Sequence, residues 1–286
     1  MKLNLKLAQR LFLCAAPFVT GSVLTALPGS AATLAGSGAE FTLSNFSHNP
    51  VDTSTFTDTK TLTIASVSEP EASDGLDDAE SYALIPPSVQ VVATANAVST
   101  FPVASLPELT QASNVTYSLA QGDAEGTGAS YSYLGIAEST AQFVGYNFNV
   151  GAGETFSFDV AGLFGLYTSR DNVITETTSA FSNISFLLYD TSDLKNPLDF
   201  FTFSALLDNP SAEAANPVNN FLSFAGSENS NFQPEQVAFN ASFGEKEQSI
   251  FGFVQGTFSR FFDKFTSLML VGVKSNEASV SCKAVW

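Results

Sequence analysis

Cysteine, histidine and tryptophan are nearly absent from this chain, which has two, one and one of them in 286 residues. Cys14 lies in an N-terminal segment that we expect to be removed, so Cys282 alone would remain and an intramolecular disulfide is excluded. One histidine and one cysteine cannot supply the usual ligands of a zinc site. His48 lies in the run Ser47-His48-Asn49-Pro50, which is typical of a turn, and nothing near it in the sequence resembles a nucleophile elbow.

Positive charge is also scarce. The chain has 11 Lys and Arg against 28 Asp and Glu, a formal net charge of −17, and no basic residue occurs between Thr61 and Ser169. Such a chain repels phosphate backbones and anionic lipid, so partners among nucleic acids and membrane surfaces are disfavoured. The charge favours solubility and loose binding of cations instead.

The first 32 residues have the order of a secretory signal. Lys2, Lys6 and Arg10 are followed by the apolar segment Leu11–Val19 and by the small residues Ser30-Ala31-Ala32. This order predicts a signal peptide with cleavage after Ala32, and therefore a secreted or extracellular protein, with the periplasm as the alternative. The apolar segment is too short to span a membrane, which takes about 20 apolar residues, so we expect no transmembrane segment after cleavage.

Phenylalanine is abundant, with 27 Phe against 7 Tyr, and alternation of apolar and polar residues dominates after the signal. In the segment Glu154–Val160, the residues Phe156, Phe158 and Val160 alternate with polar ones. We therefore expect one all-β domain over residues 33–286, an antiparallel β-sandwich or jelly roll. The run Leu268–Val273 is apolar throughout, which predicts a central strand covered on both faces.

Further strands are expected wherever a similar pattern lies between Gly, Asn and Pro turn signals. These segments are Glu40–Phe46, Lys60–Val67, Val89–Ala95, Tyr131–Ile136, Val144–Val150, Ile184–Tyr189, Phe201–Leu207, Phe221–Phe224, Val237–Phe243, Ile250–Val254 and Val280–Trp286.

Two segments depart from this pattern. Residues 68–88 are acidic and rich in turn residues, which predicts a long exposed loop or insertion, and Ser99–Ser113 extends it past one strand. In Phe258–Phe265 the phenylalanines fall at i, i+3, i+4 and i+7, which predicts a short helix of about two turns.

The acidic segment is the candidate for a metal site. Asp74, Asp77, Asp78 and Glu80 are close enough in sequence to share one calcium ion, which prefers carboxylate oxygens. Gly75 directly follows Asp74, however, so the spacing differs from known calcium loops. A solvated acidic loop is the alternative, and no other cofactor is expected.

A glycan-binding or glycan-cleaving site has weaker support. Glycoside hydrolysis needs two carboxyl groups, but Glu154 and Asp159 have opposite parity and should point to different faces of their strand. Tyr131 and Tyr133 form the one close pair of outward aromatic residues that could stack on a sugar. Cys282 shares a strand face with Val280, so we expect it to be buried and unreactive.

The stretch Phe148–Asp159, together with Ile184–Asp190 and the small-residue strand Ala129–Ala137, resembles the ectodomains of cyanobacterial secreted proteins of the exosortase-sorted, PEP-CTERM type. The likeness covers roughly residues 120–207 and implies an all-β extracellular domain. Members of that type end in a Pro-Glu-Pro motif, an apolar helix and a basic tail, whereas this chain ends in Ser281–Trp286. We therefore expect release, or retention by non-covalent contacts, and the resemblance implies no catalytic residues.

These observations favour a non-enzymatic secreted protein of the cell surface or extracellular matrix. Its expected partners are extracellular polysaccharide or other surface proteins, with calcium as a bridging ion. A carbohydrate-binding module, with or without calcium, is the alternative, and a glycan-active enzyme is the third hypothesis.

Overall fold

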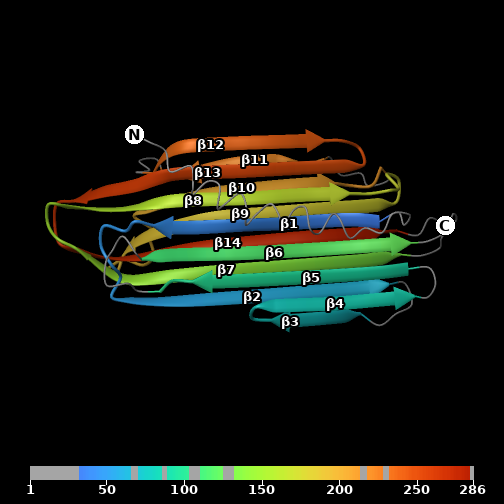
Figure 1. Cartoon of the computed structure of the whole chain (residues 1–286), viewed down its shortest axis with the longest axis horizontal. Helices are drawn as coiled ribbons and strands as arrows, with labels where there is room; N and C mark the ends of the chain where they lie inside the picture. The colour runs from blue at the N-terminus through green and yellow to red at the C-terminus, as the bar shows by residue number, and fades with distance from the viewer. Residues whose placement is uncertain are drawn as a thin grey trace.

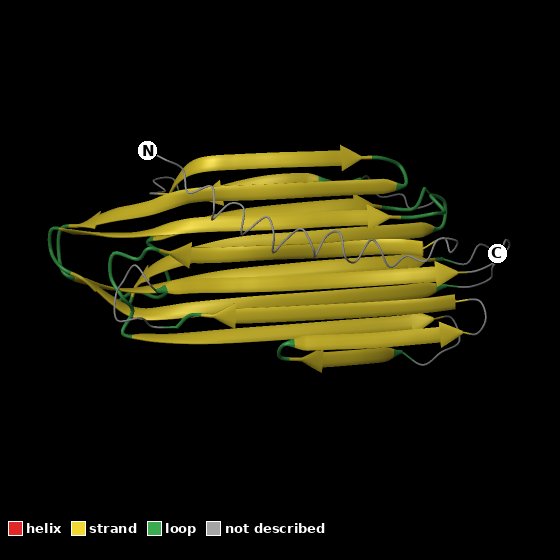
Figure 2. Ribbon diagram, viewed as in Figure 1, coloured by secondary structure: helices red, strands yellow, loops and turns green. Residues whose placement is uncertain are grey.

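The protein is a sandwich of two seven-stranded antiparallel sheets, and no helix occurs in the part of the chain that is described (Figures 1 and 2). The computed structural model describes residues 32–65, 70–85, 89–102, 110–124, 132–212, 218–227 and 232–283. The expected all-β antiparallel sandwich is therefore confirmed. None of these residues belongs to a helix that could cross a membrane, and the expected signal peptide lies outside them.

The two sheets run in parallel layers, each ordered from an open edge to a closed one. Sheet A has the order β12 (Phe232–Phe243), β13 (Glu247–Phe262), β8 (Glu154–Ser169), β1 (Ala32–Ser44), β6 (Gln111–Ala124), β5 (Val89–Thr100) and β4 (Asp78–Ile85). Sheet B has the order β11 (Phe221–Gly226), β10 (Asp199–Asn209), β9 (Glu176–Asp190), β14 (Thr266–Cys282), β7 (Tyr133–Val150), β2 (Asp52–Ala65) and β3 (Glu71–Gly75).

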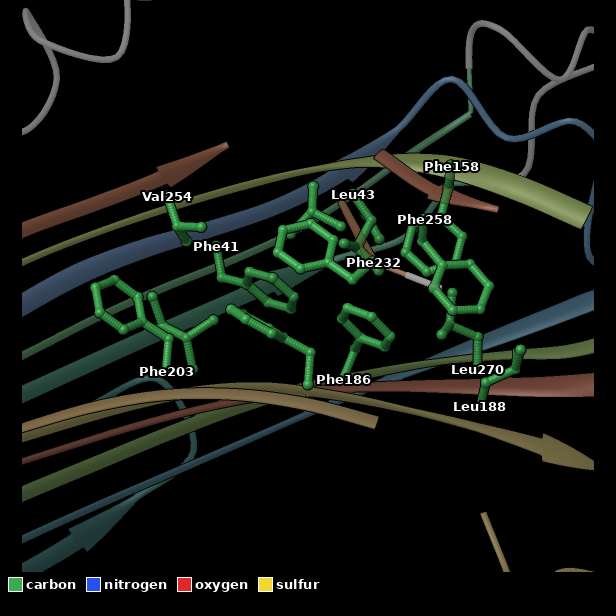
Figure 3. Close-up of a cluster of buried hydrophobic side chains, with 14 of the residues drawn as sticks. Phe41, Leu43, Phe158, Phe186, Leu188, Phe203, Phe232, Val254, Phe258 and Leu270 are labelled. Atoms are coloured by element: carbon green, nitrogen blue, oxygen red, sulfur yellow. The ribbon is translucent and has the colours of Figure 1, made fainter. Parts of the chain in front are cut away.

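Phenylalanine rings fill the space between the sheets over much of the molecule. The alternation predicted for β8 and β10 is confirmed, since Phe156, Phe158, Phe201 and Phe203 are all buried. Rings from the two sheets interlock, with centroids 5.3 Å apart for Phe158 and Phe186. Figure 3 shows these side chains pointing toward one another from both layers. Each such ring contributes roughly 1.5 to 3 kcal/mol on burial.

Small side chains fill the other part of the core. Ala93, Ala95 and Ala137 form one cluster there, and hydroxyl and amide groups lie among the alanines. Side chains this small let one sheet reach the backbone of the other: Ser37 Oγ of β1 donates to the Phe181 carbonyl oxygen of β9 at 2.6 Å. The sandwich is therefore held by ring packing in one region and by cross-sheet hydrogen bonds in the other.

The helix expected over Phe258–Phe265 is wrong. Residues 258–262 finish strand β13, and they pair with residues 158–154 of β8. Phe258 and Phe262 are buried, whereas Phe261 and Phe265 are exposed. A spacing of four residues places two side chains on one face of a strand as well as of a helix, so part of the pattern was ambiguous.

The apolar run Leu268–Val273 belongs to a central strand, as expected, but it is not covered on both faces. In β14, Leu268 and Leu270 are buried, while Met269, Val271 and Val273 are only partly buried. Sandwich strands have one solvent-facing side, and here that side is apolar too. A run without alternation therefore did not indicate two covered faces.

Strand β7 reads as two segments in the sequence because its alternation changes phase. Odd-numbered residues are buried up to Phe143, and the even-numbered Phe148 and Val150 are buried beyond it. Asn147 has a φ of 55°, and the register with β14 shifts between Leu268 and Leu270. A β-bulge thus turns Tyr146 outward, against the expected inward placement, without ending the strand.

The described part of the acidic segment 68–88 is not a loop. Residues 71–75 form β3 at the edge of sheet B, and residues 78–85 form β4 at the edge of sheet A. We call residues 71–85 the acidic corner, because the chain crosses there from one sheet to the other. The expected extension over Ser99–Ser113 is also largely wrong where it is described, since β5 runs to Thr100 and β6 begins at Gln111.

Candidate functional site

The acidic corner carries all four residues of the candidate calcium site. Asp74, Asp77, Asp78 and Glu80 are all exposed. Asp74 pairs with Lys60 across β2 and β3, on the outer side of sheet B, because the alternate residues Thr59 and Thr61 are buried.

Asp78 and Glu80 point the other way. They alternate on β4 with the buried Ala79 and Ser81, so they lie on the outer side of sheet A. The corner thus presents carboxylates on both outer faces of the sandwich and does not bring the four together. Among the described residues, no group of three or more His, Cys, Asp and Glu side chains could hold a metal ion.

Hydrogen bonds fix the turn between the two strands of the corner. Thr57 Oγ1 donates to Asp77 Oδ1 at 3.1 Å, and the Asp77 carbonyl oxygen accepts from the Ala97 amide at 2.7 Å. Thr59 Oγ1 donates to the Gly75 carbonyl oxygen at 3.0 Å. A Cβ at Gly75 would lie 2.2 Å from the Asp78 carbonyl oxygen, so the turn requires glycine. The carboxylates are therefore held on a defined backbone.

His48 lies in the β1–β2 connection, as expected, but it has specific partners there. Its Nδ1 lies 2.9 Å from Ser47 Oγ, and its Nε2 lies 3.1 Å from Glu154 Oε2. A hydrogen bond from the Gly151 amide, and next the bond from His48, lower the pKa of the Glu154 carboxyl. With Glu154 ionised, Nε2 carries the proton and Nδ1 can accept from Ser47, which is the order of a hydroxyl, an imidazole and a carboxylate in hydrolases.

The hydroxyl of Ser47 is already engaged by the backbone of β8. Ser47 Oγ accepts from the Ser157 amide at 2.9 Å and lies 3.2 Å from the Thr155 carbonyl oxygen. The Ser47 amide in turn donates to the Ser157 carbonyl oxygen at 2.9 Å. These contacts dock the β1–β2 connection onto β8, so a structural role accounts for Ser47 and His48.

The two carboxylates of β8 have separate partners, as their parity predicts. Glu154 bonds His48 and the Gly151 amide, whereas Asp159 accepts from Asn45 Nδ2 at 2.6 Å and Thr257 Oγ1 at 2.9 Å. Asp159 thereby ties β8 to its neighbours in sheet A.

The expected pair of outward tyrosines is wrong for Tyr133, which is buried, and Tyr131 lies outside the described residues. The Tyr133 hydroxyl lies 2.7 Å from Thr33 Oγ1 and 3.3 Å from Glu176 Oε1, and burial raises its pKa. The tyrosine support for a carbohydrate platform therefore disappears. Cys282 is partly buried on the Val280 side, and burial raises the pKa of its thiol.

A buried lysine in the core was missed by the sequence analysis. Lys274 on β14 is fully buried, and its Nζ donates to Ser182 Oγ and the Ser275 carbonyl oxygen, each at 2.9 Å, and contacts Asn276 Oδ1. Asn276 Nδ2 donates onward to the carbonyl oxygens of Ser37 and Thr116 in sheet A. Burial lowers the pKa of Lys274 strongly. Its position in a row of alternating inward residues was the available signal.

Arg170 and Glu176, at the other end of the strands, were also missed. Arg170 Nε donates to the Glu245 carbonyl oxygen at 2.9 Å, and its Nη1 to that of Pro210. Glu176 Oε2 accepts from the amides of Asp171 and Asn172, each at 2.9 Å. These two nearly buried charged residues hold the connections between strands in place, so they read as structural.

Comparison with known proteins adds no relative: no family model, no curated protein and no solved structure matches this chain. The acidic corner therefore stands as the candidate functional site on its geometry alone.

Proposed function

We propose that the protein is a non-enzymatic, secreted component of the cell surface or extracellular matrix. It presents the carboxylates of the acidic corner to calcium ions, which bridge them to anionic polysaccharide. One observation carries the proposal: Asp74 faces outward from sheet B, while Asp78 and Glu80 face outward from sheet A.

This arrangement suits bridging better than a closed metal site. A closed calcium site gathers six to eight oxygen ligands around one ion. Separate exposed carboxylates leave most of the coordination sphere of each ion open to carboxylates of a polysaccharide. Because the sandwich is rigid and its two faces carry acids at the same corner, one molecule can contact polysaccharide on either side.

Retention on an immobilised polyuronate tests the proposal. The wild-type chain should bind with calcium and elute when a chelator removes it. The variant D74N/D77N/D78N/E80Q should lose most of this retention. The variant E235Q/E245Q/E247Q/D263N removes four exposed carboxylates elsewhere and serves as the charge-matched control, so it should bind like the wild type. Retention that ignores calcium, or that both variants lose equally, would contradict the proposal.

A further inference from the structure

The two edges of the sandwich differ in how they end. At one edge the acidic corner passes from β3 to β4 and joins the sheets. At the other edge, sheet A ends in β12 and sheet B ends in the shorter β11 (Figure 1). In the described part of the chain, β12 pairs with β13 and with no other strand, so its second edge presents unpaired backbone groups.

The inner face of β12 is apolar and half exposed. Val237, Phe239 and Phe243 are 43%, 45% and 58% exposed. Phe239 faces sheet B, because its ring lies 5.5 Å from that of Phe224 and 5.9 Å from that of Phe203. Since β11 has 6 residues and β12 has 12, the described strands of sheet B cover only part of this face. A long apolar edge strand of this kind is a site for pairing with another strand.

The charge along this edge favours a second copy of the same chain as the occupant. The whole chain has a net charge of −17, so two copies repel each other over most of their surfaces. Among the 12 residues of β12, Glu235 is the one charged residue, and β11 has none. Two copies therefore meet with least repulsion where their β12 edges face each other.

We propose that β12 pairs with β12 of a second copy, antiparallel, around a twofold axis perpendicular to the sheets. Rotation about this axis keeps sheet A in its layer and reverses the strand direction, so sheet A continues into a fourteen-stranded sheet. The interface is isologous, because the same strand serves on both sides and the contact closes at two copies. This inference concerns the edge away from the acidic corner, and it does not depend on the proposed function.

The register that suits the side chains is centred on Asn240. It places Val237 opposite Phe243 of the second copy, and Phe239 opposite Ala241, so large side chains meet on the apolar face without two phenylalanines colliding. The two Glu235 residues are then ten positions apart along the strands. At about 3.4 Å per residue this is roughly 34 Å, several times the screening length of about 8 Å at physiological salt.

Sedimentation of the full chain over a range of concentrations is the first test. The chain has a mass of 30.2 kDa, and we expect a reversible shift to twice that mass as concentration rises. Added salt should strengthen the dimer, because it screens the repulsion between two acidic molecules. A monomer at every concentration and salt level would overturn the proposal, including the case in which another part of the chain covers β12.

Matched substitutions locate the interface. Phe243→Lys places a charge on the exposed inner face of β12 and should abolish the dimer. Phe261→Lys makes the same change at a residue that is 63% exposed and lies outside the segment of β13 that pairs with β12, so it should leave the dimer intact. Circular dichroism checks that both variants fold. A dimer that survives Phe243→Lys would overturn the proposal.

Cysteine cross-linking tests the register independently. In a Cys14→Ser, Cys282→Ser background, single cysteines at positions 238, 239, 240 and 241 are oxidised, and covalent dimer is measured. Facing residues of antiparallel strands lie about 4.5 to 5.5 Å apart between Cα atoms, which a disulfide can bridge. Cross-linking should be strongest at position 240, because that residue faces itself. Equal or absent cross-linking at all four positions would overturn this register.

Discussion

At the scale of single residues, Lys274 is the least ordinary feature of the molecule. An amine buried among Ser182, Asn276 and the backbone is held by hydrogen bonds, and no carboxylate accepts from it in the described structure. Burial therefore disfavours its charged form and lowers its pKa. In the unfolded chain the same amine titrates near about 10.4.

This difference predicts a pH dependence of stability. Below about pH 10.4 and above the lowered pKa of the folded state, the unfolded chain binds the extra proton. The free energy of unfolding should therefore rise with pH in that window, by up to about 1.4 kcal/mol per pH unit. Lys274→Met removes the titrating group, so its urea-unfolding free energy should change less between pH 7 and 10. Parallel pH curves for the two proteins would count against the buried, neutral amine.

Individual site residues could be predicted from the sequence only in part. The acidic residues of the corner were identified by their density in the segment 71–80, which is a local property. Their division between two outer faces depends on the pairing of β3 with β2 and of β4 with β5, which no local pattern shows. In the same way, His48 was correctly expected in a turn, but its contact with Glu154 joins positions 106 residues apart.

At the scale of elements, alternation located most strands but failed where inward side chains are small. Strand β6 was missed because its buried residues include Ala112, Ser118 and Ala120, which carry little hydrophobic signal. Strands β3 and β4 were missed because acidic residues are uncommon in strands. Edge strands are the exception, since charges there hinder pairing with other molecules.

The replacement of the expected helix by the end of β13 can be measured. Phe258 packs against Phe158 with centroids 4.9 Å apart, whereas Phe261 is 63% exposed. Phe258→Ala should lower the free energy of unfolding by about 3 to 5 kcal/mol, and Phe261→Ala by less than about 0.5 kcal/mol. A helix with all four phenylalanines on one face would make both losses large. Urea unfolding of the two variants decides between these outcomes.

The turn of the acidic corner gives a second prediction at this scale. A Cβ at Gly75 would meet the Asp78 carbonyl oxygen, a backbone atom that cannot swing aside. Gly75→Ala should therefore cost about 1 to 3 kcal/mol of stability. The matched control is Gly38→Ala in β1, where the new methyl would lie 3.6 Å from the Tyr117 side chain, an ordinary contact. Thermal unfolding of both variants tests this, and equal losses would show that the turn has no special constraint.

At the scale of the whole molecule, the fold class could be predicted because the chain repeats one signal many times. Alternating phenylalanines in β8, β10 and β13 each build one side of the same core, so errors in single elements did not change the sandwich. The strand order could not be predicted, since it places β14, the last strand, between β7 and β9 in sheet B. Such long-range pairing is set by how complete faces pack, which a short window of sequence does not contain.

The whole molecule is also where function resides in this account. One edge is closed and acidic, the other is open and apolar, and a rigid core keeps them apart (Figure 1). The central claim is that the acidic edge binds calcium weakly through separate carboxylates. Pairing at the apolar edge would place two such acidic edges at opposite ends of one dimer.

Calorimetric titration of the protein with calcium tests that claim most directly. The wild-type chain should show weak binding, with a Kd of about 10⁻⁴ to 10⁻³ M, in the range of extracellular calcium modules. The variant D74N/D77N/D78N/E80Q should lose most of the heat, and the E235Q/E245Q/E247Q/D263N control should keep it. No calcium heat from the wild-type chain, or equal heat from the wild type and the corner variant, would contradict the account.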